Sequence, residues 1–380
     1  MTKIYTMIKR FWADPGTLIE AGKVLIIYGA RRVGKTTLVK EWLKNTSLKY
    51  RYESGDNIRI KNLLGSGDFD IIKEFASGYD IIVIDEAQQI PDIGKGLKIL
   101  VDEIPDLRII ATGSSSFDLL QQVGEPLTGR KRTVKLFPVA QKELIAEMNR
   151  YELKENLENY LVFGSYPEVL MSKSKKEKTR VLNELVETYL LKDVLSFERI
   201  KNSALLFKLL KLLAFQVGNI VSLNEIARQL GINVKTVGRY IDLLEKSFVI
   251  YHVGSFSGNL RKEIVKKNKY YFYDNGIRNA VILQMNGLED RNDIGALWEN
   301  FLMTERIKKF NYEEVYYNCY FWRNYHGNEI DLLEEHNGTL NAYELKWKKT
   351  KAGIPNDFVK KYGNPGFAII HSANYPDFVL

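Results

Sequence analysis

The chain of 380 residues contains one cysteine, Cys319, and only four histidines. A single cysteine excludes a disulfide within the chain and a zinc site built from several thiolates. With so few histidines as well, a metal ion would be held mainly by oxygen ligands. Such sparing use of cysteine is typical of proteins from reducing compartments, and we expect the protein to be cytoplasmic.

Long apolar runs are also missing from the sequence. None approaches the ~18 consecutive apolar residues of a membrane-spanning helix, so we expect no membrane association. Residues 1–12 lack the apolar core and the small-residue cleavage site of an export signal. The formal net charge of +8 permits nucleic-acid binding without requiring it. The length of the chain predicts about two or three domains.

The stretch from Lys23 to Lys40 organises the N-terminal part of the chain. Its run from Val24 to Tyr28 is apolar and rich in β-branched and aromatic residues, which predicts a buried strand. The pattern G-x-x-x-x-G-K-[ST] of a phosphate-binding loop follows, and then the apolar face of a helix, in the order that this motif requires. A glycine-rich turn with a chance lysine is the alternative. The residues expected to contact a nucleotide are Gly29, Ala30, Arg31, Arg32, Val33, Gly34, Lys35, Thr36 and Thr37.

The residue types in this loop suit the chemistry of phosphate binding. Gly29 and Gly34 let the backbone curl, so that its N–H groups point inward at an anion. Lys35 is expected to bridge the β- and γ-phosphates, and the Thr36 hydroxyl is expected to be a ligand of Mg²⁺. The loop therefore predicts a nucleoside triphosphate with Mg²⁺.

A second apolar strand, Ile81 to Ile84, ends in two carboxylates, Asp85 and Glu86. Asp85 at the strand tip is expected to hold Mg²⁺ through a bound water. Glu86 is expected to polarise the attacking water as a general base. A glutamate that only faces solvent at a strand end is the alternative, and the phosphate-binding loop upstream favours the catalytic role.

Three polar residues farther along are weaker candidates for the same site. Thr112 and Ser114 follow a predicted strand at Leu107 to Ala111, and either is able to position water beside the γ-phosphate. A plain turn explains them equally well, because Gly and Ser are common in loops. Arg130 is a candidate arginine finger, in cis or across a subunit contact, although an ordinary surface arginine fits as well.

One strand lies between the two nucleotide motifs in the sequence, and the second motif carries Glu86; this arrangement resembles the additional-strand ATPases. The N-K-x-D signature of guanine binding is absent, which favours ATP. The chain as a whole resembles the archaeal and bacterial AAA-type ATPases whose C-terminal half is a domain of unknown function. The segments that carry this resemblance are Gly29 to Thr37, Ile84 to Gln88, Thr112 to Ser115, Gly129 to Arg130, Leu136 to Pro138, Gly164 to Leu170, Tyr189 to Asp193, Lys269 to Gly276 and Glu344 to Lys346.

Residues 151–280 are expected to form a helical lid or connector and then a winged helix-turn-helix over about 203–275. Ser222 and Glu225 form a capping box before the first helix, Gly231 ends it, and Val234 to Lys246 forms the second. We expect DNA as a partner of this module; the alternative is a lid or a protein-contact module, roles that winged helices also serve. The residues expected to contact DNA phosphates are Lys235, Thr236, Arg239, Arg261, Lys262, Lys266 and Lys267.

The order of elements in residues 281–380, α-β-β-β-α-β, resembles the core of PD-(D/E)xK nucleases. Strand alternation puts Glu344 and Lys346 on one face, and Asp331 lies on the preceding strand. Together with Glu299 on a helix, these carboxylates are candidate ligands of Mg²⁺, and Lys346 is a candidate for activating water. An inactive nuclease-like fold used for binding or dimerisation is the alternative.

The expected protein is thus α/β, with an AAA-type additional-strand ATPase domain at 1–150, the connector with its winged helix at 151–280, and a nuclease-like domain at 281–380. Two functions compete. In one, an ATPase uses ATP and Mg²⁺ to act on DNA. In the other, the chain is a nucleotide-driven switch that binds a protein partner. That partner is another protein or a second copy of this chain.

Overall fold

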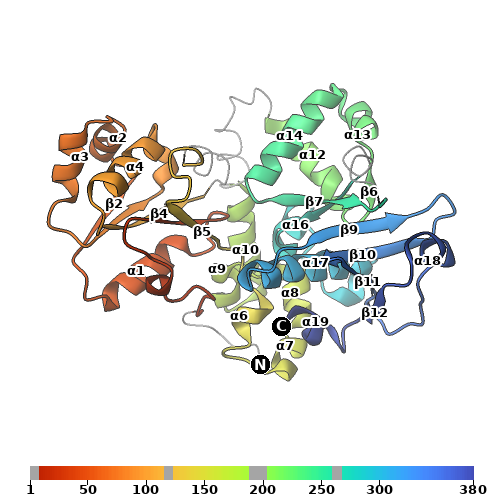
Figure 1. The fold of residues 1–380 in the computed structure, drawn as a ribbon. Helices are drawn as coiled ribbons and strands as arrows, with labels where there is room; N and C mark the ends of the chain where they lie inside the picture. Colours follow the sequence, from red (N-terminus) through yellow and green to blue (C-terminus); the bar gives the residue numbers. More distant parts are fainter. Residues whose placement is uncertain (1–7, 115–122, 188–202, 259–267) are drawn as a thin grey trace. The chain divides into compact units, whose positions relative to one another are not determined.

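A computed structural model describes residues 8–114, 123–187, 203–258 and 268–380 (Figure 1). By its contacts, the chain divides into two compact units. We call Lys9–Pro138 with Lys246–Phe248 the N-terminal unit, and Val139–Glu245 with Val249–Leu380 the C-terminal unit. The domain boundaries expected at residues 150 and 280 stay predictions.

The N-terminal unit is built on a sheet of five parallel strands in the order β2-β3-β4-β1-β5. Strand β4 lies between β1 and β3, which is the insertion that defines an additional-strand sheet. The elements are η1 (Pro15–Thr17), β1 (Val24–Tyr28), α1 (Lys35–Asn45), β2 (Tyr50–Ser54), α2 (Ile58–Leu64), α3 (Phe69–Ala76), β3 (Ile81–Asp85), η2 (Ala87–Gln89), α4 (Ile93–Glu103), β4 (Arg108–Gly113) and β5 (Lys131–Lys135).

Burial on both faces of this sheet follows from its parallel strands, whose connecting helices cover each side. In β3, four successive residues from Ile81 to Ile84 have no exposed surface. Alternate residues such as Ile82 and Ile84 share one face and pack in a core that also contains Leu97 and Leu100 of α4. The carboxyl ends of the strands therefore meet at one edge, held in place by a packed core.

The C-terminal unit contains a sheet of seven strands in the order β12-β11-β10-β9-β7-β8-β6. Parallel pairing of β7 with β9 joins the hairpin β7–β8 to the strands that follow residue 281. The helices before this sheet are α6 (Gln141–Leu144), α7 (Arg150–Glu155), α8 (Leu157–Phe163), α9 (Pro167–Met171), α10 (Lys175–Leu185) and α12 (Ser203–Phe215). The later elements are β6 (Ile220–Val221), α13 (Leu223–Leu230), α14 (Val234–Lys246), β7 (Ile250–Ser255), β8 (Asn268–Phe272), α16 (Asn275–Val281), η4 (Leu288–Asp290), α17 (Ile294–Tyr312), β9 (Asn318–Arg323), β10 (Glu329–His336), β11 (Thr339–Leu345), α18 (Asn356–Tyr362), β12 (Gly366–Ile370) and α19 (Tyr375–Val379).

The two helices expected as a helix-turn-helix are present as α13 and α14. Ser222 caps α13 by accepting a hydrogen bond from the backbone of Glu225, and Gly231 ends it with a φ of 64°. Strands β7 and β8 follow as an antiparallel pair, and the assignment of a winged helix stays a prediction. Four of the expected DNA-contacting residues, Arg261, Lys262, Lys266 and Lys267, lie outside the described residues, as do Ser115 and the segment Tyr189 to Asp193.

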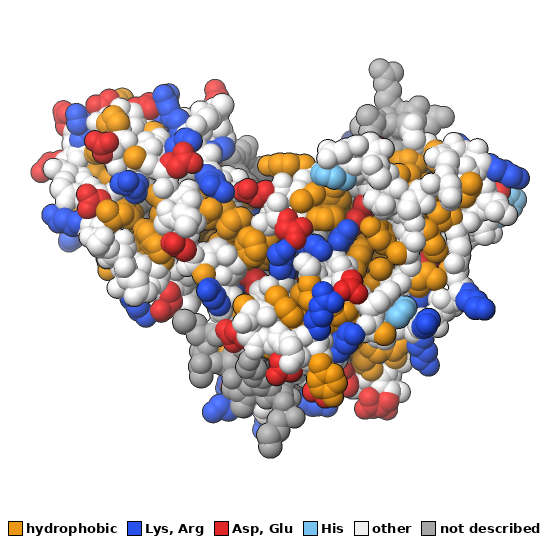
Figure 2. Space-filling view, turned by 60° about the horizontal axis from the view of Figure 1, so that its bottom comes forward, with side chains coloured by type: hydrophobic (Ala, Val, Ile, Leu, Met, Phe, Trp, Pro, Cys, Tyr) orange, Lys and Arg blue, Asp and Glu red, His pale blue; other side chains and the backbone are white. Residues whose placement is uncertain are grey.

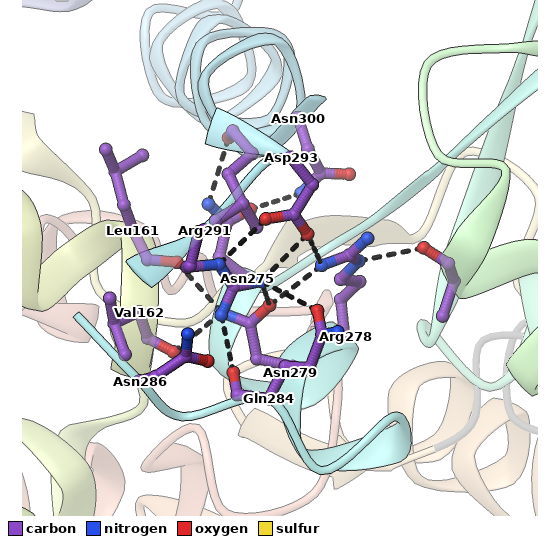
Figure 3. A network of polar contacts seen from close by, with 12 residues as sticks. Leu161, Val162, Asn275, Arg278, Asn279, Gln284, Asn286, Arg291, Asp293 and Asn300 are labelled. Atoms are coloured by element: carbon purple, nitrogen blue, oxygen red, sulfur yellow. Dashed lines mark hydrogen bonds and ion pairs between the residues drawn. The ribbon is translucent and has the colours of Figure 1, made fainter. Parts of the chain in front are cut away.

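A buried polar network ties three helices of the C-terminal unit together (Figure 3). Asn279 of α16 donates to the carbonyls of Leu161 and Val162 in α8, at 3.0 and 2.8 Å. Arg278, which is 2% exposed, donates to the carbonyl of Ala214 in α12 at 2.8 Å and pairs with Asp293. Because buried polar groups are costly when unpaired, such a network fixes how these helices pack. None of the helices in the described ranges has the length and apolar character that crossing a membrane requires.

Candidate functional site

The phosphate-binding loop connects β1 to α1 at the carboxyl edge of the five-stranded sheet. Gly29 has a φ of 150°, and a Cβ atom placed on it would lie 2.0 Å from the carbonyl oxygen of Leu136. Gly34 caps α1 with a φ of 97°. Both positions therefore need glycine, one because of the close backbone and both because of the positive φ.

Lys35 begins α1 and is 5% exposed. Its Nζ donates to the carbonyls of Gly29 and Ala30 at 2.9 and 2.8 Å. Burial lowers the pKa of Lys35 to about 8, against the nearby carboxylates of Glu86 and Asp85, which favour the charged form. The ammonium group is thus held inside the curl of the loop, where an anion would compensate its desolvation.

Other loop residues frame this position. Val33 is fully buried, and its carbonyl accepts a hydrogen bond from Arg10, which also donates to Phe137 O at 2.7 Å. Arg32 has a φ of 57°, and Thr37 is exposed on the first turn of α1. Arg31 is partly exposed. Arg10 was missed in the sequence, because nothing local marks an arginine that reaches the loop from 23 residues away.

Asp85 at the end of β3 accepts hydrogen bonds from three hydroxyl groups. Thr36 Oγ1 donates to its Oδ2 at 2.9 Å, Tyr52 OH donates to the same oxygen at 2.6 Å, and Thr112 Oγ1 donates to Oδ1. Burial, followed by the hydrogen bond to Asp85, raises the pKa of Tyr52. Tyr52 was not predicted. It lies on β2, the parallel neighbour of β3, so it can be assigned to the site only when the order of the strands in the sheet is known.

The oxygen atoms of Thr36 and Asp85 suit Mg²⁺, which prefers hard oxygen ligands and keeps several of its waters. The hydroxyl and the carboxylate are 2.9 Å apart, so that a single ion or its bound water is able to reach both. The donor set in this structure therefore fits the expected ion.

Glu86 follows Asp85 with a φ of 50°. Its backbone N–H donates to Thr112 Oγ1 at 3.2 Å, and its Oε2 accepts from Gln88 Nε2 and, at 3.4 Å, from Ser114 Oγ. The structure therefore brings Glu86, Thr112 and Ser114 together. Gln88 was not predicted as a site residue, although it ends the segment Ile84 to Gln88 that carries part of the family resemblance.

Arg130 lies elsewhere. It immediately precedes β5, and its carbonyl accepts from Val24 N at the amino end of β1, whereas the phosphate-binding loop leaves the carboxyl end of β1. Its guanidinium pairs with Asp102 at 2.8 Å. Within one chain the structure does not bring Arg130 to the other site residues, and an action on a neighbouring subunit stays a prediction.

In the C-terminal unit, Lys346 joins the two strand carboxylates. Its Nζ lies 2.9 Å from Asp331 Oδ2 and 2.8 Å from Glu344 Oε2. Burial and the neighbouring Asp331 raise the pKa of Glu344 to about 7, while Lys346 acts in the opposite direction. The structure therefore brings these three residues together, as the E-x-K spacing and the strand order predicted.

Glu299 is held by other groups. Lys269 Nζ lies 3.1 Å from its Oε1, and Tyr271 donates to the same oxygen at 2.7 Å. In the described part of the chain, no group of three or more His, Cys, Asp or Glu side chains is arranged to hold a metal. The expected three-carboxylate ligand set of Glu299, Asp331 and Glu344 is therefore not formed among these residues.

Three parts of the chain match known families. Residues 21–145 match an AAA domain, residues 154–292 match a domain of unknown function (DUF8612), and residues 294–369 match another domain of unknown function (DUF4143). The first match covers the phosphate-binding loop, Asp85, Glu86 and Thr112. It supports the predicted AAA-type, ATP-binding domain, while the resemblance of the C-terminal part to nucleases stays a prediction.

Relatives extend over most of the chain. An uncharacterised protein of Mycobacterium tuberculosis is 25% identical over 340 residues, which cover 87% of this chain and 72% of that protein. An uncharacterised protein of Methanocaldococcus jannaschii is 24% identical, in an alignment that covers 91% of this chain and 83% of that protein. A solved Walker-type ATPase of Pyrococcus abyssi is 16% identical, with a TM-score of 0.48 over 68% of this chain and 91% of that chain, a likeness that says nothing about function.

Proposed function

We propose that the protein binds Mg·ATP in its N-terminal unit and hydrolyses it to ADP and phosphate. The observation that carries the proposal is the meeting of the two sequence motifs at Asp85, where the Thr36 hydroxyl lies 2.9 Å from the carboxylate. The match of residues 21–145 to an AAA domain supports the same activity. Bound Mg²⁺ would neutralise charge on the β- and γ-phosphates.

The residues of the chain have separate tasks in this reaction. Backbone N–H groups of the loop and Lys35 bind the phosphates, and Asp85 with Thr36 holds the metal. Glu86 accepts a proton from a water whose oxygen forms a bond to the γ-phosphorus. The bond from that phosphorus to the β–γ bridging oxygen breaks, ADP leaves with the electron pair, and the proton passes from Glu86 to solvent.

Two variants separate binding from turnover. Lys35→Ala is expected to abolish ATP binding, and Glu86→Gln is expected to keep binding and lose turnover by a factor of about 100 or more. Lys44→Ala is the matched control, because Lys44 lies in the last turn of the same helix with its side chain 65% exposed. Hydrolysis that is unchanged in both site variants would overturn the proposal.

A second candidate function, action on DNA, is favoured by the exposure of Lys235 and Arg239 on α14. On the face drawn in Figure 2, Lys and Arg side chains lie among Asp and Glu side chains, so the net positive charge is not gathered there into one patch. The proposed DNA contact is made by α14 and the segment expected to be its wing. The alternative remains a nucleotide-driven switch that acts on a protein partner.

Removal of four charges tests the DNA contact. Neutralising Lys235, Arg239, Arg261 and Lys262 together is expected to weaken binding and to flatten its salt dependence by about 0.9 per lost phosphate contact. The control variant neutralises four exposed residues elsewhere. They are Lys173, which precedes α10, and Lys175, Lys176 and Arg180, which lie in α10. ATP turnover that rises with single- or double-stranded DNA supports action on DNA, and slow turnover that ignores DNA supports the switch.

A further inference from the structure

Gln88 bridges the ends of two neighbouring strands in the nucleotide site. It lies in η2, directly after β3, and its Nε2 donates to Glu86 Oε2 and, at 3.1 Å, to Ser114 Oγ. Glu86 follows β3 and Ser114 follows β4, and these strands are paired side by side. The amide nitrogen thus uses one hydrogen for the Glu86 carboxylate, the expected general base, and the other for Ser114, whose hydroxyl also donates to that carboxylate at 3.4 Å.

The amide oxygen of Gln88 takes no part in these hydrogen bonds. Gln88 Oε1 is buried and has no hydrogen-bond partner among the residues that the structure describes. A buried carbonyl without a partner costs free energy, so most such groups in folded proteins bind a neighbouring group or an ordered water. This one belongs to a side chain that is already bonded to Glu86, beside the expected position of the reacting water.

We propose that Gln88 is a positioning residue for ATP hydrolysis: its amide nitrogen holds Glu86, and its amide oxygen orients the attacking water. A water between the two side chains donates one hydrogen to the Glu86 carboxylate and the other to Gln88 Oε1. Both of its hydrogens are then engaged, and a lone pair is left to face the γ-phosphorus. The proton still goes to Glu86, because a neutral amide cannot accept it. This inference rests on the proposed hydrolysis of ATP.

The test compares two neighbouring glutamines of one short helix. Gln88→Leu keeps the approximate size of the side chain and removes its hydrogen bonds, while Gln89→Leu makes the same change at an exposed position of η2. Single-turnover hydrolysis of Mg·ATP and equilibrium binding of ATPγS are measured for both, with thermal unfolding to compare their folds. We expect Gln88→Leu to slow the chemical step at least tenfold, with affinity for ATPγS within twofold of the parent, and Gln89→Leu to match the parent in both.

The outcomes separate this inference from the function on which it rests. A parent that hydrolyses ATP, with Gln88→Leu as fast as Gln89→Leu, overturns the role of Gln88 and leaves the ATPase function intact. A loss of ATPγS affinity in Gln88→Leu equal to its loss of rate also overturns it, because the side chain then acts in binding. A parent without ATP turnover overturns both.

Discussion

Thr36 donates a hydrogen bond to Asp85 Oδ2 at 2.9 Å, although the two residues are 49 positions apart in the chain. Thr36 lies in the first turn of α1, which follows β1, and Asp85 ends β3, while β4 lies between β1 and β3. All three strands run parallel, so their carboxyl ends share one edge of the sheet. The two motifs therefore meet because of the strand order, and a hydroxyl and a carboxylate come within reach of one metal ion.

Tyr52→Phe is expected to reduce ATP turnover about tenfold and to raise the Mg²⁺ concentration needed for half-maximal rate. The variant removes the hydrogen bond of 2.6 Å to Asp85, and a hydrogen bond to a charged group contributes about 1.5–3 kcal/mol. Steady-state hydrolysis over a Mg²⁺ titration measures the effect. Tyr50→Phe on the same strand is the control, since Tyr50 is 42% exposed. Identical Mg²⁺ curves for the two variants would contradict the role of Tyr52.

Gly29→Ala is expected to destabilise the N-terminal unit and to abolish ATP binding. The added Cβ would lie 2.0 Å from Leu136 O at a φ of 150°, so the loop must move away from β5. Gly129→Ala is the control that distinguishes backbone strain from a steric clash of the added Cβ. Gly129 also has a positive φ, 74°, but no atom lies within 4 Å of an added Cβ. Urea unfolding measures the stability of both variants, and ATPγS binding measures their nucleotide affinity. Equal losses of stability in Gly29→Ala and Gly129→Ala would mean that the positive φ alone, and not the contact with Leu136 O, causes the destabilisation.

ATP binding above pH 8 is expected to take up a proton at Lys35. In the nucleotide-free protein, burial lowers the pKa of Lys35 from its ordinary 10.5 to about 8, so most molecules hold a neutral amine at pH 9. Phosphate beside the amine favours its charged form, and affinity therefore falls as the pH rises through about 8. Calorimetry at pH 9, in buffers with different ionisation enthalpies, counts the proton. Lys35→Arg should show no uptake, because arginine stays charged; equal uptake in this variant would assign the proton to another group.

Lys346→Met is expected to destabilise the C-terminal unit more at pH 8 than at pH 6. The raised pKa of Glu344, from 4.5 to about 7, means that the folded protein binds more protons than the unfolded chain between these values. Stability from this group is therefore present at low pH and falls as the pH rises through 7. Without Lys346, the ionised Asp331 and Glu344 repel each other, which steepens the fall.

Urea unfolding at the two pH values measures this effect, with the exposed Lys348→Met as the control. A loss of stability that is equal at pH 6 and pH 8 would show that packing of the Lys346 stem matters and its charge does not. ATP hydrolysis in Lys346→Met should equal that of the parent, because the nucleotide site is in the other unit.

The sequence alone determined the features that depend on local order. The phosphate-binding loop lies between a strand and a helix, with β1 at Val24–Tyr28 and α1 beginning at Lys35, because apolar period and motif spacing are properties of neighbouring residues. The same reasoning located α13 and α14 at their observed bounds, since Ser222 and Gly231 act on the helix beside them. The E-x-K spacing also predicted that Glu344 and Lys346 lie close together, although β11 ends at Leu345 and Lys346 directly follows it.

Tertiary structure decided what meets these residues from elsewhere. Tyr52, Arg10 and Gln88 belong to the nucleotide site only because sheet order and loop conformation bring them there. Glu299 of α17 pairs with Lys269 and Tyr271 of β8, which are about 30 positions away in the chain. The described residues hold no three-carboxylate set. Strand pairing is long-range and has no local code in the chain, whereas a loop motif or a helix cap is complete within a few residues.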